Sequence, residues 1–176
     1  YKKQDAMYTT RPINDSDLPV ICGFFAVERE LHYAFPGVAY PLTEAVLKSF
    51  VDARSDATVL LSKGKVVGFA DLFNIHENAE CHIGNVIISK DHRRKGATLF
   101  LLQAMTDMAV SRHHVTRLIA PCWCENTRGL LLYSKLGFKP FDIMIKNHDD
   151  RETVPVLLLE KNLDMDLPEP SPVGTV

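Results

Sequence analysis

The most informative segment of the chain is ISKDHRRKGAT, residues 88–98. Apolar residues leading up to Ile88 predict a strand, and apolar residues at helical spacing after Ala97 predict a helix, so a basic turn with Gly96 joins the two. The first N–H groups of a helix lack intrahelical acceptors, the helix dipole adds partial positive charge, and glycine allows close backbone approach. Residues 93–95 add basic side chains. The turn therefore predicts a site for a phosphate or pyrophosphate, with a solvated basic turn as the alternative.

Two common nucleotide-binding motifs do not fit this turn. A P-loop needs four residues between its glycines and then Gly-Lys-Ser/Thr, whereas here Lys95 precedes Gly96. A dinucleotide fingerprint needs three spaced glycines, and the turn has only Gly96. We therefore expect a phosphate carrier of another type.

The rest of the chain predicts further strands and helices around this turn. Their order is β-α-α-β-β-β-α-β-α-β-β, with no internal repeat. Strands are expected at residues 7–13, 58–62, 66–75, 80–88, 118–123, 138–145 and 154–160, and helices at 15–31, 42–53, 97–111 and 126–135. We expect one domain over residues 1–163. The tail, residues 164–176, is expected to be mobile because it has several prolines and few apolar residues.

The composition excludes several classes of protein. The chain has 176 residues, of which 46% are hydrophobic and 24% charged, and these values are typical of one soluble globular domain. A formal net charge of −2 provides no general attraction to nucleic acid. No apolar run approaches the roughly 18 residues that a membrane span needs. We therefore expect neither nucleic acid nor a membrane as a partner.

The four cysteines indicate a reducing compartment. Cys22, Cys81, Cys122 and Cys124 have neither the C-x-x-C spacing of a zinc pair nor the density of a disulfide scaffold. The first residues lack the apolar region of a secretion signal. We therefore expect a cytoplasmic protein without a bound metal. Cys122 and Cys124 are expected to be buried free thiols, and a covalent acyl-cysteine step through Cys122 is the alternative.

Two segments, in the right order, carry a resemblance to a known family. Residues 93–98, RRKGAT, look like a Q/R-x-x-G-x-G/A pyrophosphate loop, except that Thr98 stands where the pattern has glycine or alanine. Residues 126–138, NTRGLLLYSKLGF, look like an N-x-x-A/G…Y-x-K-x-G-F segment. The chain thus resembles the GNAT superfamily of acyl-CoA-dependent N-acyltransferases over residues 7–163. The resemblance implies a single α/β (α+β) domain, in which about four helices flank a mixed central sheet of six to seven strands.

The resemblance also implies an activity and a set of contacts. An acetyl group would pass from acetyl-CoA, the co-substrate, to a primary amine of a small molecule or peptide, by direct attack in a ternary complex. The implied CoA contacts are the backbone of Val86, Ile87 and Ile88 for the pantetheine arm, the loop of Arg93, Arg94, Lys95, Gly96, Ala97 and Thr98 for the pyrophosphate, and Asn126 and Gly129 along the arm. Asn126 equally fits a helix N-cap, and the two roles are compatible.

Three residues are candidates for moving protons. An alkyl amine with a pKa near 10.4 is almost wholly protonated at neutral pH, so a base is useful. The resemblance nominates His82, and strand alternation places Glu80 on the same face, where it could act directly, through water or by orienting His82. The resemblance nominates Tyr133 to protonate the leaving thiolate. In the alternative interpretation, His82 and Tyr133 are ordinary packed residues.

Acceptor choice in this fold usually comes from the first two helices, their loop and a late hairpin. The loop region carries His32, Tyr33, Phe35 and Tyr40 with Glu28, Glu30 and Glu44 nearby, and the hairpin carries Asp142 and residues 148–150. Aromatic rings with carboxylates suit a cationic or aromatic amine, so Tyr33, Phe35 and Tyr40 are the expected substrate contacts. In the alternative interpretation, the rings pack and the acids face water.

Two other functions stay open at this point. A non-catalytic acyl-CoA-binding or sensing domain would keep the loop without turnover, and a plain anion-binding module would not bind acyl-CoA. A small amine, an antibiotic, a peptide N-terminus and a lysine side chain all fit as acceptors. Because many relatives pair through their late strands, the resemblance also suggests a homodimer.

Overall fold

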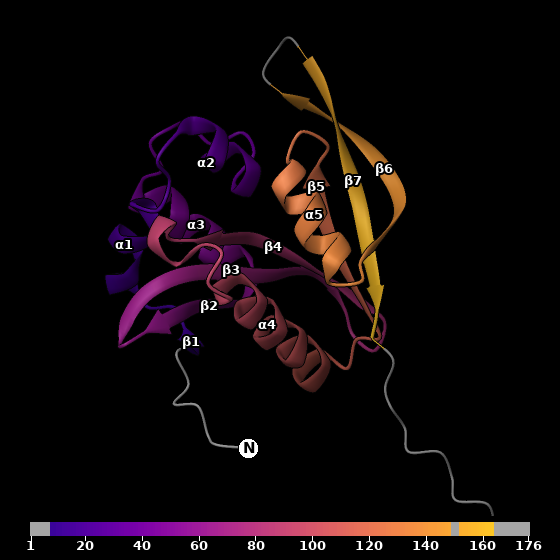
Figure 1. The fold of residues 1–176 in the computed structure, drawn as a ribbon, viewed down its shortest axis with the longest axis horizontal. Helices are drawn as coiled ribbons and strands as arrows, with labels where there is room; N and C mark the ends of the chain where they lie inside the picture. Colours follow the sequence, from indigo (N-terminus) through magenta and orange to yellow (C-terminus); the bar gives the residue numbers. More distant parts are fainter. Residues whose placement is uncertain (1–7, 149–151, 164–176) are drawn as a thin grey trace, which may run out of the picture.

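The computed structural model describes residues 8–148 and 152–163. Within these residues, seven strands form one sheet with the order β1-β2-β3-β4-β5-β7-β6 (Figure 1). Neighbouring strands are antiparallel except β4 and β5, which are parallel. The strands are β1 (Thr9–Pro12), β2 (Ser55–Ser62), β3 (Lys65–His76), β4 (Glu80–Ile88), β5 (Arg117–Trp123), β6 (Lys139–His148) and β7 (Glu152–Asn162). The helices are α1 (Leu18–Cys22), α2 (Glu28–Ala34), α3 (Glu44–Ala53), α4 (Ala97–His113) and α5 (Thr127–Lys135), with 3₁₀ turns at Asp15–Asp17 and Lys90–His92.

The continuous helix expected over residues 15–31 is wrong, because the chain forms α1 and α2 there. α1 ends before its C-cap Gly23, whose N–H donates back to the last turn of the helix. Glycine weakens a helix, and the helix ends here. The side chain of Phe25, which lies between α1 and α2, is buried in the core. His32 and Tyr33, which the sequence places in a loop, therefore lie on α2.

The remaining architecture follows the expectation closely. A single α/β domain with a mixed seven-stranded sheet confirms the predicted fold class, and α2 accounts for a fifth helix in the described part of the chain. The other predicted elements differ from the observed ones only near their ends. The tail at residues 164–176 lies outside the described residues, as do Asp149 and Asp150 of the late hairpin. Among the helices described, none is both long enough and apolar enough to cross a membrane.

Helices cover both faces of the sheet (Figure 1). α4 and α5 pack on one face, where Leu101 and Tyr133 belong to one cluster of buried side chains. α1, α2 and α3 pack on the other face, where Leu31 and Leu47 belong to a second cluster. Burial of these apolar faces on a central sheet is the main stabilising contribution in such a layered domain.

β4 and β5 diverge after a short paired segment. In the described chain they pair at three positions of β4, from Glu80 to His82. A β-bulge follows at Asn85, where φ is 52° and the register between β3 and β4 shifts by one residue. A bulge bends its strand and re-aims the following side chains. The second half of β4, which ends at Ile88, therefore stays paired with β3 while its edge toward β5 is open.

Candidate active site

The turn between β4 and α4 presents free backbone N–H groups. Gly96 is the N-cap of α4 and has a φ of 82°, in the left-handed region that glycine adopts without strain. Phe100 donates its N–H to the Gly96 carbonyl at 3.0 Å, so the N–H groups of Ala97, Thr98 and Leu99 precede the hydrogen-bond ladder of the helix. A Cβ on Gly96 would meet no atom within 4 Å. This open helix start suits an anion.

The three basic side chains of the turn have different roles. Arg93 donates from Nε to the carbonyl of Ile88 at 2.9 Å, and its Nη1 lies 2.5 Å from Oε1 of Glu30 on α2. This ion pair holds the pKa of Glu30 below its usual value. Arg94 and Lys95 are exposed, and their side chains bond to none of the described residues. Arg93 thus anchors the turn, whereas Arg94 and Lys95 offer uncompensated charge.

The open half of β4 contains Val86, Ile87 and Ile88. Ile87 and Ile88 pair with Phe69 and Gly68 of β3 along one edge. Along the other edge, β5 supplies no ladder partner to these residues in the part of the chain that the structure describes. An open strand edge can hydrogen-bond an extended ligand through its main chain, because backbone polar groups need partners.

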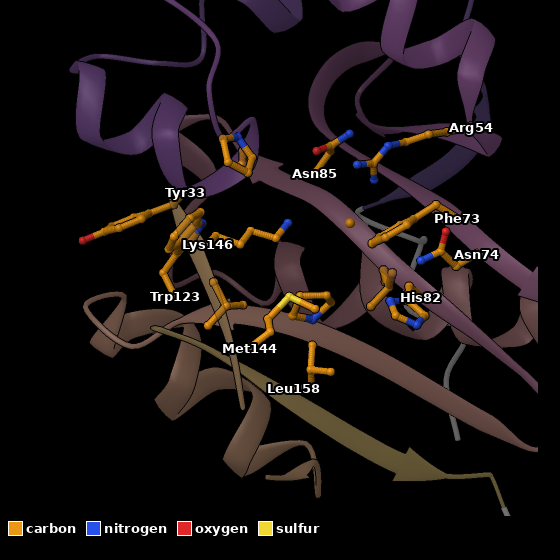
Figure 2. A pocket seen from close by; sticks show the side chains of 16 residues that line it. Tyr33, Arg54, Phe73, Asn74, His82, Asn85, Trp123, Met144, Lys146 and Leu158 are labelled. Atoms are coloured by element: carbon orange, nitrogen blue, oxygen red, sulfur yellow. The ribbon is translucent and has the colours of Figure 1, made fainter. Parts of the chain in front are cut away.

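A pocket lies beside this opening, on the face of the sheet that α2 covers (Figure 2). It encloses about 690 Å³, part of which is open solvent. Its walls come from α2 and the residues after it, from the strands β3, β4, β5, β6 and β7, and from the segment before β2. The lining residues are Tyr33, Ala34, Pro36, Arg54, Phe73, Asn74, His82, Ile83, Gly84, Asn85, Pro121, Trp123, Met144, Lys146, Val156 and Leu158. Since α4 packs on the opposite face, the gap between β4 and β5 lies between the pocket and the basic turn.

His82 lines the pocket as a neutral imidazole. Its ring packs edge-on against Phe73, with 5.0 Å between the ring centroids. Its Nδ1 is buried and has no hydrogen-bond partner among the described residues. Burial lowers the pKa of His82 below the ordinary 6.5, although the nearby Glu80 acts in the opposite direction. His82 is therefore unprotonated at neutral pH and able to accept a proton.

Glu80 lies at the closed end of the β4–β5 pair and does not line the pocket. Nε of Arg117 donates to its Oε2 at 2.9 Å, and Nη1 of Arg117 donates to Glu160 at 2.9 Å. Arg117 holds the pKa of Glu80 below its usual value, mainly through the hydrogen bond. This carboxylate is consequently a weak proton acceptor, so we do not assign it the role of base.

Tyr133 lies on the other side of the gap, on α5. Its ring is buried and packs edge-on against Phe138, with 5.3 Å between the ring centroids. Burial raises the pKa of the Tyr133 phenol well above 10, and the phenol therefore stays protonated. Its hydroxyl forms no hydrogen bond with any described residue. Tyr133 is thus part of the core, and its phenol is also able to donate a proton.

Asn126 acts as the N-cap of α5. Its Oδ1 accepts a hydrogen bond from the N–H of Gly129 at 3.0 Å. A Cβ on Gly129 would lie 2.7 Å from Asn126 Nδ2 and 2.9 Å from Cys122 Sγ. The glycine therefore makes room for the cap and the thiol, a reason that the sequence alone does not reveal.

A buried polar group that the sequence analysis missed adjoins the pocket. Asp71 is fully buried; its Oδ1 accepts from Arg54 Nη1 at 2.9 Å, and its Oδ2 accepts from Asn85 Nδ2 at 2.6 Å. Burial raises the pKa of Asp71 to about 6. Arg54 also stacks over Phe73, with 4.1 Å from Cζ to the ring centroid. The only signal in the sequence is an aspartate inside an apolar strand.

The structure brings only one of the three expected substrate aromatics to the pocket. Tyr33 lines the pocket, and its hydroxyl donates to the carbonyl of Glu125 at 3.3 Å. Phe35 is fully buried in the core between Phe25 and Phe50 and cannot contact a substrate. Tyr40 is exposed and does not line the pocket. The acids of the loop and hairpin that lie within the described residues do not line it either.

The described residues offer little to metal or thiol chemistry. No group of three or more His, Cys, Asp or Glu side chains among them is arranged to hold a metal ion. The four cysteines are free, and burial raises the pKa of the Cys122 thiol to about 12. Because the thiolate is the nucleophilic form, this burial argues against a covalent acyl-cysteine step.

Comparisons with known proteins agree with this geometry. A family model described as the acetyltransferase (GNAT) family matches residues 24–138. A search of curated protein sequences found no significant match. Several solved structures share the fold. One is a putative acetyltransferase, yncA, from Salmonella typhimurium with its cofactor acetyl-CoA, at 18% identity and a TM-score of 0.70, covering 94% of this chain and 99% of that one.

Two further structures come from Vibrio species. The ribosomal-protein-S5-alanine acetyltransferase of Vibrio fischeri has 19% identity and a TM-score of 0.72, with 92% of this chain and 96% of that chain covered. The spermidine N-acetyltransferase of Vibrio cholerae, in complex with CoA and spermine, has 16% identity and a TM-score of 0.73, with 90% and 97% covered. At such identities the likeness shows a common fold.

Proposed function

The chain belongs to the GNAT acetyltransferase family, and from this premise we propose that it transfers an acetyl group from acetyl-CoA to a primary amine by direct attack in a ternary complex. The observation that carries the proposal is the divergence of β4 and β5 beyond His82. This gap gives the two substrates separate approaches, from the basic turn on one face and from the pocket on the other.

We assign the binding of acetyl-CoA to the turn and to the open half of β4. The N–H groups at the start of α4, with Arg94 and Lys95, would hold the pyrophosphate. The backbone of Val86, Ile87 and Ile88 would pair with the pantetheine arm and direct N–H groups at the thioester oxygen, where negative charge develops. Thr98 replaces a smaller residue, but its N–H is available and its hydroxyl is a further donor.

We assign the base to His82. The amine must lose a proton before its lone pair attacks the thioester carbonyl carbon. His82 lines the acceptor pocket, is neutral at neutral pH and has an unsatisfied ring nitrogen. It would take the proton directly or through one water molecule, while the C–S bond breaks and the thiolate leaves.

We assign the acid to Tyr133. The leaving thiolate needs a proton, and a phenol with a raised pKa remains protonated until that point. Tyr133 belongs to the cluster under α4 and α5, whereas His82 faces the pocket on the opposite side of the sheet. The two proton transfers are thereby separated, with the base on the side of the amine and the acid on the side of CoA.

The proposal is tested by measuring free-thiol release from acetyl-CoA. The purified protein is incubated with polyamines, arylalkylamines, aminoglycosides, amino acids and short peptides in turn. Release that depends on one class of amine supports the transferase. If acetyl-CoA raises the melting temperature but no amine causes release, the chain is a CoA-binding or sensing domain. If acetyl-CoA does not stabilise the protein at concentrations well above micromolar, the site is an anion-binding module.

We also propose a cytoplasmic location, as expected from the cysteines, and a homodimer, as suggested by the resemblance to the family. The free state of all four cysteines, each within the described residues, is consistent with a reducing compartment. β6 forms an edge of the sheet and exposes Phe141, Ile143 and Ile145, which is compatible with pairing through late strands. Size-exclusion chromatography with light scattering measures the oligomeric state.

A further inference from the structure

The pocket has an unusual charge for a site that takes amines. Two of its lining residues are cationic, Arg54 and Lys146, and none of the described residues that line it is acidic. Figure 2 shows the two side chains extending into the pocket from opposite walls. A protonated amine such as a polyamine gains nothing from such walls, because like charges repel.

Arg54 is held in a fixed position. Its Nη1 donates to Asp71, and its guanidinium plane stacks over Phe73, 4.1 Å from the ring centroid. A Cβ on Gly84 would lie 2.5 Å from Nη1, so the glycine is what lets Arg54 lie against β4. Nε and Nη2 donate to none of the described residues. A fixed guanidinium with free donors is well suited to bind a carboxylate.

The positive charge of the pocket is only partly neutralised by the residues behind its walls. Asp71 offsets Arg54, but it is fully buried and bonds to Arg54 and Asn85 rather than facing the pocket. Lys146 is exposed and forms no ion pair with any residue in the described ranges. The pocket therefore keeps about one unit of excess positive charge next to the neutral His82.

The remaining walls are apolar and aromatic. Trp123 and Leu158 line the side formed by β5 and β7, Met144 comes from β6, and Tyr33 and Phe73 lie on the other walls. Apolar and aromatic walls with a few charged groups fix a small ligand by burying its apolar part and pairing its polar ends. An acceptor for this pocket therefore has an apolar body as well as an anionic end.

We propose that the acceptor is a small amine that also carries a carboxylate, such as an α-amino acid with an apolar side chain. Arg54 and Lys146 bind the carboxylate, the apolar walls take the side chain, and the amine is directed toward His82. The inference rests on the proposed function and narrows its substrate class. It replaces the cationic amine that the acidic residues of the sequence suggested.

Matched acceptors test the proposal. Thiol release from acetyl-CoA is measured with phenylalanine, phenylalanine amide and phenethylamine, and with leucine, leucine amide and isoamylamine. We expect kcat/KM for each amino acid to exceed that of its amide and of its decarboxylated amine by at least about tenfold, because a charge-assisted contact is lost. The amide gives the stricter comparison. Its amine is less basic than that of the amino acid and loses its proton more readily, so a lower kcat/KM for the amide cannot be due to the deprotonation step.

Lys146→Met identifies the residue involved, with Lys139→Met on the same strand as its control. Lys146→Met should raise KM for the amino acid by about tenfold and leave the decarboxylated amine unaffected. Lys139 does not line the pocket, so Lys139→Met should match the wild type. Arg54→Lys keeps the charge but removes the planar guanidinium, and it should also raise KM for the amino acid. Melting temperatures verify that each variant is folded.

The outcomes separate this inference from the proposed function. If the amides, the decarboxylated amines or polyamines are used as well as the amino acids, the inference is overturned while the transferase stands. If Lys146→Met and Lys139→Met behave alike toward amino acids, the role of Lys146 is overturned. If no amine of any charge releases thiol, the proposed function fails and this inference fails with it.

Discussion

β4 and β5 pair from Glu80 to His82 and then diverge toward Ile88 and Trp123, so the two ends of this strand pair can be compared within one molecule. At the closed end, Arg117 bonds to both Glu80 and Glu160, so each of the three charged side chains has a partner of opposite charge. At the open end, polar groups of the described residues lack partners: the Nδ1 of His82, the edge of β4, the first N–H groups of α4 and the side chain of Lys146.

The comparison indicates where this domain binds its substrates. A buried polar group without a partner costs stability, so a stable fold satisfies buried polar groups wherever no ligand needs them. The closed end follows that rule and aligns the strands. The open end departs from it, because a ligand can supply the missing partners there. We therefore expect substitutions at the open end to change rate and binding, and substitutions at the closed end to change the free energy of unfolding.

The largest expected effect is that of Tyr133→Phe at the open end. Without the phenol proton, kcat should fall by about 100-fold, while CoA still raises the melting temperature as in the wild type. Steady-state kinetics and thermal shift measure the two quantities. Tyr40→Phe is the matched control, because Tyr40 is exposed and lies outside the pocket. An unchanged kcat for Tyr133→Phe would remove Tyr133 from the mechanism.

His82→Gln should lower kcat/KM by about 10- to 100-fold with little change in CoA binding. The wild-type pH profile gives a second readout. Burial lowers the pKa of His82, so the neutral, active form persists below pH 6.5, and kcat/KM falls only as the pH drops through that lowered pKa. If kcat/KM begins to fall above pH 6.5 as the pH is lowered, or if His82→Gln keeps the same pH dependence, another residue is the base.

Glu80→Gln examines the closed end and should have a smaller effect. It weakens the bond to Arg117, so we expect a loss of less than about 1 kcal/mol in the free energy of unfolding, because these side chains are partly exposed. We expect kcat/KM to stay within about twofold of the wild type, because Glu80 lies outside the pocket. A loss of activity comparable to that of His82→Gln would break the division between the two ends.

The smallest effect is expected at His113, which bonds to Asp56 at 2.6 Å and to Glu77 at 2.8 Å near the start of β4. These carboxylates raise the pKa of His113, mainly through the hydrogen bond to Asp56. The resulting stability is fully present below pH 6.5 and is lost as the pH rises through the raised pKa. Denaturant unfolding should show this decline in the wild type and not in His113→Asn, with a difference below about 1 kcal/mol. If the free energy of unfolding depends on pH equally in the wild type and in His113→Asn, the ion pairs of His113 do not contribute to stability.

The strand, turn and helix at residues 80–113 could be predicted because their signals are local. Apolar residues at a period of two end at Ile88, Gly96 marks the N-cap, and apolar residues at a helical period follow it. The break between α1 and α2 could not be predicted in the same way. Phe24 and Leu31 are seven residues apart, as on one helical face, and only the core against which both pack shows that they belong to separate segments.

The sequence by itself determined the order of the elements, the basic turn, the positions of His82 and Tyr133, and the family that these motifs resemble. Each depends on spacing along a few residues, which fixes local hydrogen bonding and side-chain direction. The tertiary structure decided which end of the β4–β5 pair opens, that Glu80 belongs to the closed end, and that Arg54 and Lys146 meet in one pocket. Those two cations lie on elements far apart in the chain, and only the packing of α2, β3, β4 and β6 around the gap brings their charges together.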